Sequence, residues 1–196
     1  MGTIRVHEFI TLDGVIEDPK WSFGFPFDPK MGAAIGAIMG GCSAILLGRR
    51  TYEQFAPAWS GRTAEQDPGA PFMNDTAKYV VSGTLDNADW ANSSVLGKYS
   101  PDTIEGLKQR VTGGIYVSGS GTLVRAMLAD GLVDELHLFV YPVAVGSGAQ
   151  LFPQEGRTTT LELAGCESYG NGVVHLTYAP PASTNTSPNN TVPTNG

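Results

Sequence analysis

The chain has 196 residues, of which 41% are hydrophobic and 16% charged, and its formal net charge at pH 7 is -7. This composition is that of one globular domain and excludes fibrous and wholly disordered proteins. The negative charge argues against binding to nucleic acid, because such proteins need a basic face. No run reaches the ~18 apolar residues of a membrane span, and the first residues lack the basic start and apolar middle of a signal peptide. We therefore expect a cytoplasmic protein with no nucleic-acid or membrane partner.

The cysteines and histidines do not form a metal-binding pattern. Cys42 and Cys166 are far apart in the sequence and form no CxxC pair, so they indicate neither a zinc site nor a disulfide framework. His7, His137 and His175 each lie in an apolar, strand-like run without a second ligand at metal spacing. We predict histidines of the core or of a sheet face, and no bound metal.

Short β-branched runs alternate along the chain with segments of helical period, which is the pattern of an α/β domain. Strands are predicted at residues 4–11, 44–47, 78–82, 115–118 and 135–143, with an antiparallel hairpin at 160–169 and 172–178 around Asn171-Gly172. Helices are predicted at 29–41, for one or two turns at 50–55, after Ser100-Pro101-Asp102 and after Gly121. We expect a mostly parallel sheet with an antiparallel C-terminal edge.

The last seventeen residues differ in composition from the rest of the chain. Residues 180–196 contain four Pro, four Thr and four Asn, with no charged or aromatic side chain. Such a segment cannot bury enough apolar surface to offset the entropy lost on ordering. The sequence therefore predicts one domain over residues 1–179 and a disordered tail over 180–196.

A glycine-rich turn, Gly119-Ser120-Gly121, leads from a buried strand into a helix that begins at Thr122 and Leu123. Glycines let the backbone approach a ligand closely, and the free N–H groups of a helix's first turn favour an anion such as a pyrophosphate. The turn is not a GxGxxG motif and lacks the lysine of a P-loop. Taken alone, it is more typical of an ordinary connection between a strand and a helix.

A second candidate follows another buried strand, where Gly48 precedes Arg49, Arg50 and Thr51 at the start of a helix. Guanidinium groups bind phosphate through two parallel hydrogen bonds. The alternative is a solvated arginine pair with Thr51 as a helix cap. Ser82, before Gly83-Thr84, ends a third strand in the same way. Because ligands of open α/β sheets bind beyond the carboxyl ends of the strands, we expect the Gly48–Thr51 loop and the Gly119–Gly121 loop to converge on one dinucleotide.

Two aspartates are candidate acids. Asp13 follows the first strand and either accepts a hydrogen bond from a ligand or closes a turn, and the turn is the safer interpretation. Asp28 precedes the predicted helix at 29–41 and is either its N-cap, which we prefer, or an acid facing the substrate. The aromatic residues Trp21, Phe23, Phe25 and Phe27 between them either cover a flat heterocycle or fill an edge of the core.

Several segments, taken in order, resemble the dihydrofolate reductase-like superfamily. They are TLDGVI, LLGRRTYEQF, KYVVS, IYVSGSGTLVRAMLADGLVDELHLFVYPVAVGSGAQLF and the final hairpin, and together they cover about residues 3–178. The chain is most similar to the stand-alone family named for the C-terminal reductase domain of the bifunctional riboflavin-biosynthesis deaminase-reductase, the RibD C-terminal domain. This resemblance implies a three-layer fold, with helices on both faces of the sheet, that binds NADPH along the carboxyl edge, often in a homodimer.

The resemblance also implies roles for particular residues. Residues 48–51 match the segment that contacts the adenosine-side phosphate and the pyrophosphate, and Ser82 matches the residue near the adenosine ribose. Residues 119–123 match the glycine loop beneath the pyrophosphate. Thr11, Leu12 and Asp13 match the segment beside the nicotinamide and the substrate.

These observations lead to an NADPH-dependent reductase that transfers hydride to a C=N or carbonyl carbon of a small pterin- or pyrimidine-like heterocycle. We predict that an acid or an ordered water near Asp13 or Asp28 delivers the proton. The alternative is a non-catalytic protein that retains the fold and binds a nucleotide or heterocycle. Nucleophilic hydrolysis has no support, because the chain has no GxSxG elbow and neither cysteine has an obvious histidine neighbour.

Overall fold

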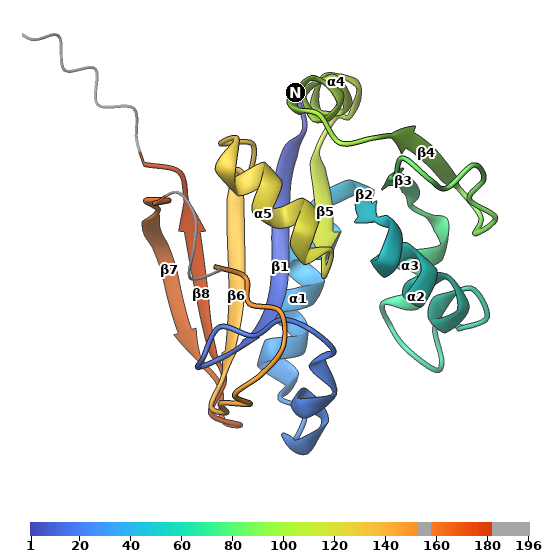
Figure 1. Ribbon diagram of the computed structural model, residues 1–196. Coiled ribbons are helices and arrows are strands. Elements are labelled where there is room, and N and C mark those ends of the chain that lie inside the picture. Colours follow the sequence, from blue (N-terminus) through green and yellow to red (C-terminus); the bar gives the residue numbers. More distant parts are fainter. Residues whose placement is uncertain (153–157, 182–196) are drawn as a thin grey trace, which may run out of the picture.

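An eight-stranded sheet runs through the computed structural model, which describes residues 1–152 and 158–181 (Figure 1). The strand order is β4-β3-β2-β5-β1-β6-β8-β7. The strands are β1 (Thr3–Thr11), β2 (Cys42–Gly48), β3 (Ala77–Val81), β4 (Ser93–Gly97), β5 (Gly114–Ser118), β6 (Glu135–Tyr141), β7 (Glu162–Ser168) and β8 (Val174–Ala179). Strands β1 to β6 pair in parallel, whereas β8 is antiparallel to both β6 and β7. The predicted mostly parallel sheet with an antiparallel C-terminal hairpin is confirmed.

Helices cover both faces of this sheet. They are the 3-10 helix η1 (Pro19–Gly24) and the α-helices α1 (Pro29–Gly40), α2 (Arg49–Trp59), α3 (Ala70–Asp75), α4 (Pro101–Arg110) and α5 (Gly121–Ala129). In Figure 1, α5 crosses in front of β1, β5 and β6, and α1 lies behind them. The buried residues of α4 and α5 belong to one apolar cluster, and those of α1, α2 and α3 belong to another. The domain therefore has three layers.

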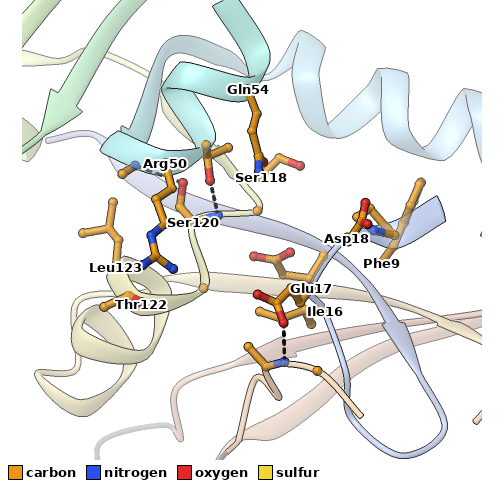
Figure 2. A pocket seen from close by; sticks show the side chains of 18 of the residues that line it. Phe9, Ile16, Glu17, Asp18, Arg50, Gln54, Ser118, Ser120, Thr122 and Leu123 are labelled. Atoms are coloured by element: carbon orange, nitrogen blue, oxygen red, sulfur yellow. Dashed lines mark hydrogen bonds between the residues drawn. The ribbon is translucent and has the colours of Figure 1, made fainter. Parts of the chain in front are cut away.

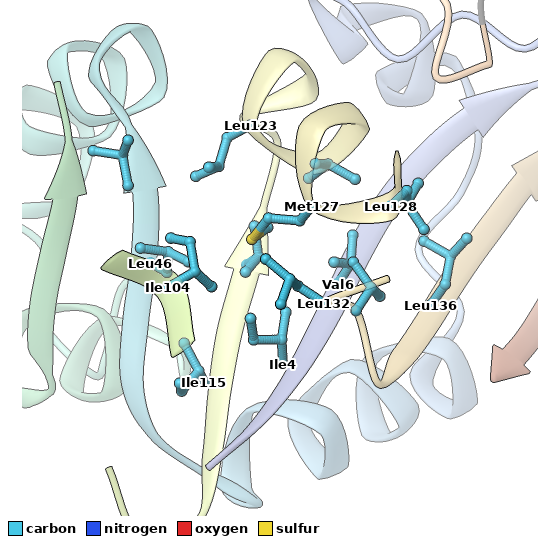
Figure 3. Packing of buried hydrophobic residues seen from close by; sticks show 14 of the residues in the cluster. Ile4, Val6, Leu46, Ile104, Ile115, Leu123, Met127, Leu128, Leu132 and Leu136 are labelled. Carbon is cyan, nitrogen blue, oxygen red and sulfur yellow. The ribbon is translucent and has the colours of Figure 1, made fainter. Parts of the chain in front are cut away.

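Each central strand contributes to both cores. Ile4 and Val6 of β1 pack with Met127 of α5 in the first cluster (Figure 3), whereas Ile45 and Leu47 of β2 lie in the second. Because successive side chains of a strand point to opposite faces, a strand covered on both sides must be apolar at nearly every position. This is why the predicted strands appear in the sequence as continuous apolar runs.

The structure contains elements that the sequence did not predict: η1, α3 and β4. Each is short or at an edge, and their residues carry little hydrophobic periodicity. Helix α2 runs on to Trp59 with Pro57 inside it, beyond the one or two turns predicted from Arg50 to Phe55.

No helix among the described residues is long and apolar enough to cross a membrane. Of the predicted tail, residues 182–196 lie outside the described part of the chain, and the predicted homodimer stays a prediction.

Asp28 is the N-cap of α1, as preferred from the sequence. One carboxylate oxygen accepts the backbone N–H groups of Lys30 (2.8 Å) and Met31 (3.4 Å), and the other accepts that of Gly170 (2.8 Å) in the β7–β8 connection. Burial alone would raise the pKa of Asp28, but these N–H groups outweigh it and lower the pKa below its usual value. The carboxylate therefore joins two segments that are far apart in the sequence.

Asp28→Ala is expected to lower the unfolding temperature by about 2 to 4 °C, because it removes a helix cap. Asp28→Asn, which keeps one acceptor oxygen, should lower the unfolding temperature by less than Asp28→Ala does. Asp86→Ala, at an exposed aspartate, is the matched control. Since the folded-state pKa of Asp28 is depressed, its stabilising effect is present above about pH 4 and disappears as the pH falls through the folded-state pKa. Thermal unfolding followed by circular dichroism tests this, and equal unfolding temperatures of Asp28→Ala and wild type at pH 7 would contradict the capping role.

Candidate functional site

A cavity of about 1330 Å³ opens at the carboxyl ends of β1, β2 and β5. It lies where two paired strands part: the pairing of β5 with β1 ends at His7 and Ser118, while β1 continues to Thr11 beside β6 alone. The edge of β1 beyond His7 is therefore no longer covered by β5. A gap beside a strand that changes partners is where open α/β sheets bind their ligands.

The two loops predicted to bind phosphate meet at this cavity. The backbone N–H of Gly48 donates to Oγ of Ser120 (2.9 Å), and the backbone N–H of Ser120 donates to Oγ1 of Thr51 (2.8 Å). These bonds join the β2–α2 turn to the β5–α5 turn across 69 to 72 residues of sequence. The expectation that the two loops converge is confirmed, and Thr51 links them.

The β5–α5 turn has the backbone that an anion site needs. Gly119 (φ 60°) and Ser120 (φ 58°) are both left-handed, and Ser120 precedes α5 without giving it a side-chain cap. A Cβ on Gly119 would lie 3.2 Å from Cγ2 of Thr51, and a Cβ on Gly121 would lie 2.6 Å from Cδ1 of Ile16. Glycine is therefore favoured at position 119 by both its left-handed backbone and the close approach of Thr51, whereas at position 121 the Ile16 side chain could move aside. No side chain caps the first N–H groups of α5.

Three guanidinium groups line the cavity on this side. Arg49 pairs with Glu53 one helical turn later (2.9 Å), and Arg125 donates to the carbonyl of Gln150 (2.9 Å) and to Oγ1 of Thr122 (3.2 Å). Arg50 makes no hydrogen bond or ion pair within the described chain. Figure 2 shows Arg50 beside Thr122 and Leu123. The charge of Arg50 is thus available to a phosphate.

The opposite side of the cavity carries aromatic and acidic residues. Phe9 and Trp21 line it, together with Ile16, Glu17 and Asp18 of the loop after β1, and Phe55 of α2 lines the cavity as well. In Figure 2 the labelled residues of this group lie across the cavity from Arg50. Glu17 accepts the backbone N–H of Ala149 (3.0 Å), which ties this loop to the segment after β6.

The four aromatic residues of the loop before α1 lie in the cavity, at the edge of the core and in solvent. Trp21 lines the cavity, and Phe25 packs edge-on against Tyr141 at 5.3 Å, as Trp21 also does. Phe23 and Phe27 are exposed. The loop thus contributes one aromatic side chain to the cavity and one to the core edge.

Four of the predicted site residues do not line the cavity: Thr11, Asp13, Asp28 and Ser82. The hydroxyl of Thr11 donates to the carboxylate of Asp13, which also accepts the backbone N–H of Gly146 (2.7 Å). These bonds lower the pKa of Asp13, with the Thr11 hydroxyl as the largest cause. Oγ of Ser82 accepts the N–H groups of Thr84 and Leu85.

Asp13 therefore closes the turn after β1 and fastens it to the segment after β6. An aspartate whose pKa is depressed holds no proton at neutral pH, so neither Asp13 nor Asp28 has one to give. Their predicted part in catalysis, and the ligand contacts of Thr11 and Ser82, stay predictions. The remaining predicted cofactor residues, Gly48, Arg49, Arg50, Thr51, Gly119, Ser120, Gly121, Thr122 and Leu123, all line the cavity.

Sequence reasoning missed several lining residues, notably His7, Glu8, Gln54 and Arg125. His7 is buried, its Nδ1 lies 2.6 Å from the Tyr116 hydroxyl, and burial lowers its pKa to about 3, so it is neutral. Glu8 occupies the same face of β1 as Ile4, Val6 and Ile10. An acid at an inward position of an alternating strand was the signal that could have found it.

The chain is similar in sequence and fold to known proteins. Residues 2–175 match the RibD C-terminal domain family. The protein YyaP of Bacillus subtilis (strain 168) is 27% identical over 177 residues, which are 86% of this chain and 90% of YyaP. The structure of a putative riboflavin biosynthesis protein from Shewanella sp. PV-4 superposes with a TM-score of 0.73 at 19% identity, covering 91% of this chain and 98% of that one.

A dihydrofolate reductase from Enterococcus faecalis, complexed with NADP(H) and RAB-propyl, superposes with a TM-score of 0.57 at 15% identity, covering 92% of this chain and 98% of that one. The likeness to these solved structures confirms the dihydrofolate reductase-like fold predicted from the sequence. Since the family match spans nearly all of the described domain, the chain belongs to the RibD C-terminal domain family.

Proposed function

We propose that the protein is a reductase that uses NADPH to reduce a small heterocycle of pterin or pyrimidine type. The observation that carries this proposal is the direct hydrogen bonding between the β2–α2 and β5–α5 turns at the mouth of the cavity. Two adjoining anion-binding turns suit a pyrophosphate between two nucleosides better than they suit a single phosphate. The dihydrofolate reductase from E. faecalis, which shares the fold, is complexed with NADP(H).

The residues present fit such a cofactor. A Cβ on Gly119 would crowd Thr51, so glycine leaves room at this turn. The N–H groups of residues 121–123, which no side chain caps, suit a pyrophosphate. Arg50 supplies charge for a further phosphate, which favours NADPH over NADH. When bound, the cofactor would supply hydride from C4 of its nicotinamide, and the protein would supply alignment and electrostatics.

The substrate side suits a flat, weakly charged molecule. Phe9, Trp21 and Phe55 offer apolar faces, and the edge of β1 beyond His7 offers backbone groups that β5 does not cover. Lys20 pairs with Asp18 (2.8 Å), so the cation on this side of the cavity is already neutralised. A heterocycle with ring nitrogens can stack on the aromatic faces and hydrogen-bond to the strand edge.

Titration with NADPH tests the cofactor. Trp21 lines the cavity, so quenching of its fluorescence and sensitised emission from the reduced nicotinamide report binding. We expect micromolar affinity for NADPH, weaker binding of NADH, and a loss of about tenfold in NADPH affinity in Arg50→Ala, which is the effect of losing one charge-assisted contact. Arg110→Ala, at an exposed arginine on α4 outside the cavity, is the matched control. Equal affinities of Arg50→Ala and Arg110→Ala would contradict the phosphate role of Arg50, and no binding of either cofactor would contradict the function.

The second candidate function is a non-catalytic protein that binds a nucleotide or heterocycle. It is favoured by one observation: Asp13 and Asp28, the acids predicted to serve the reaction, lie outside the cavity lining and have depressed pKa values. A non-catalytic protein that binds the dinucleotide would also bind NADPH, whereas one that binds only a heterocycle would not. The two functions differ in consumption of NADPH, which is followed by absorbance against a panel of dihydropterins, aminopyrimidines and small carbonyl compounds.

A further inference from the structure

Glu8 is a buried carboxyl group at the floor of the cavity. It lies on β1 one residue beyond the last pair with β5, and it pairs with Leu138 of β6. Its side chain points to the face occupied by Ile4, Val6 and Ile10 and is only 3% exposed. Oε1 has no hydrogen-bond partner among residues 1–152 and 158–181, although the residue lines the cavity. A buried polar atom without a partner needs an explanation in a native structure.

The surroundings of Glu8 favour its uncharged form. Burial raises its pKa well above the usual value, and the N–H of Gly119 and the charge of Arg125 on α5 offset this only in part. Arg125 is itself engaged with Gln150 and Thr122. Tyr116, the titratable neighbour on β5, is neutral because burial raises its pKa. Desolvation thus decides the protonation state.

Glu8 differs in this respect from the other carboxyl groups of the cavity. Glu17 and Asp18 also line it but are exposed to solvent. Glu8 is therefore the one buried carboxyl group among the residues that line the cavity, and burial raises its pKa toward the protonated form. Reduction of a C=N or C=O bond needs a proton beside the carbon that accepts hydride.

We propose that Glu8 is the catalytic acid of this site, a proposal that rests on the proposed reductase function. The carbon of the substrate's C=N or C=O bond receives hydride with its electron pair, and the π electrons of that bond move to the nitrogen or oxygen. That atom takes the proton from the Glu8 carboxyl, whose O–H bond breaks. The carboxylate left behind regains a proton from water.

The position of Glu8 also couples it to the cofactor. Gly119 begins the turn that would hold the pyrophosphate, and Glu8 is close enough to its N–H to be influenced by it. An ionised Glu8 would repel a bound phosphate, whereas the neutral acid does not. NADPH binding should therefore raise the pKa of Glu8 further, and NADPH affinity should fall as the pH rises above the pKa of the free protein.

Two measurements test the protonation state without turnover. The infrared difference spectrum of wild type minus Glu8→Gln should contain the carbonyl band of a protonated carboxyl group at pH 7. In NADPH titrations over the pH range in which this band disappears, the wild-type affinity should fall by up to tenfold per pH unit, whereas that of Glu8→Gln should not follow this dependence. Since Gln has the shape of the protonated acid, the variant should fold. A carboxylate band at pH 7, or parallel pH profiles in the two proteins, would overturn the proposal.

Single-turnover reduction tests the acid itself. With NADPH and an acceptor from the panel that the wild type reduces, Glu8→Gln should be slower by about 100-fold or more, with NADPH affinity near pH 7 within about threefold of wild type. Glu105→Gln, at an exposed glutamate of α4, should match the wild type. If Glu8→Gln reduces the acceptor at the wild-type rate at every pH, Glu8 is not the acid, although the reductase function stands. If wild type binds NADPH but reduces no acceptor, the reductase function fails and the acid role fails with it.

Discussion

Gly119→Val is expected to abolish useful NADPH binding, with a dissociation constant raised by about 50-fold or more. The substitution acts in two ways. A β-branched residue at φ 60° is strained by roughly 1 to 3 kcal/mol, and its Cβ would lie 3.2 Å from Cγ2 of Thr51, so the turn must move. The valine side chain would also take up space at the turn where we propose that the pyrophosphate binds. Each 1.4 kcal/mol lost is a factor of about ten in affinity.

The control for this variant is Gly131→Val. Gly131 is also left-handed, at φ 68°, and a Cβ there would meet nothing within 4 Å. It follows the opposite end of α5 and lies outside the cavity lining. Both variants should lose similar stability through backbone strain, but Gly131→Val should retain NADPH affinity. A Gly119→Val protein that is folded and binds NADPH as well as Gly131→Val would show that the turn is not the pyrophosphate site.

Lys78→Met is expected to destabilise the fold by about 3 kcal/mol, which lowers the unfolding temperature by about 6 to 12 °C. Lys78 is fully buried, and its Nζ donates to the carbonyls of Met73 (2.9 Å), Asn74 (3.0 Å) and Thr76 (2.9 Å) at the end of α3. The ammonium also lies 4.5 Å from the ring centroid of Trp90. Methionine fills the volume but leaves these carbonyls without a donor, and an unsatisfied buried acceptor is costly.

Lys98→Met is the matched control, since Lys98 is exposed just after β4 in the same part of the sheet. It should change the free energy of unfolding by less than about 0.5 kcal/mol. Chemical denaturation of both variants measures the difference. A loss in Lys78→Met no greater than in Lys98→Met would mean that α3 does not need the ammonium. NADPH affinity should be unchanged in both, because neither lysine lines the cavity.

Local features of the sequence determined most strands of the sheet, the C-terminal hairpin and the positions of the two turns that we propose bind phosphate. The apolar runs of β1, β2, β5 and β6 are continuous because both faces of these strands are covered, so nearly every residue must be apolar. The turns at Gly48 and Gly119 follow such strands directly, and the left-handed backbone of Gly119 is a local requirement that favours glycine. Asp28 was identified as a helix cap for the same reason, because a cap acts within three residues.

Only the tertiary structure decided which polar groups reach the cavity. Asp13 was preferred from the sequence as a turn residue, but its bond to the N–H of Gly146, 133 residues away, could not be read from the local sequence. Glu8 has no motif around it and becomes a candidate acid only because β5 ends beside it and β6 and α5 cover it. Hydrogen-bond partners, burial and protonation depend on segments that meet in space, and spacing along the chain does not encode them. The sequence by itself therefore determined the scaffold and the two glycine-containing turns at the cavity, whereas packing decided which carboxyl group of the cavity is buried.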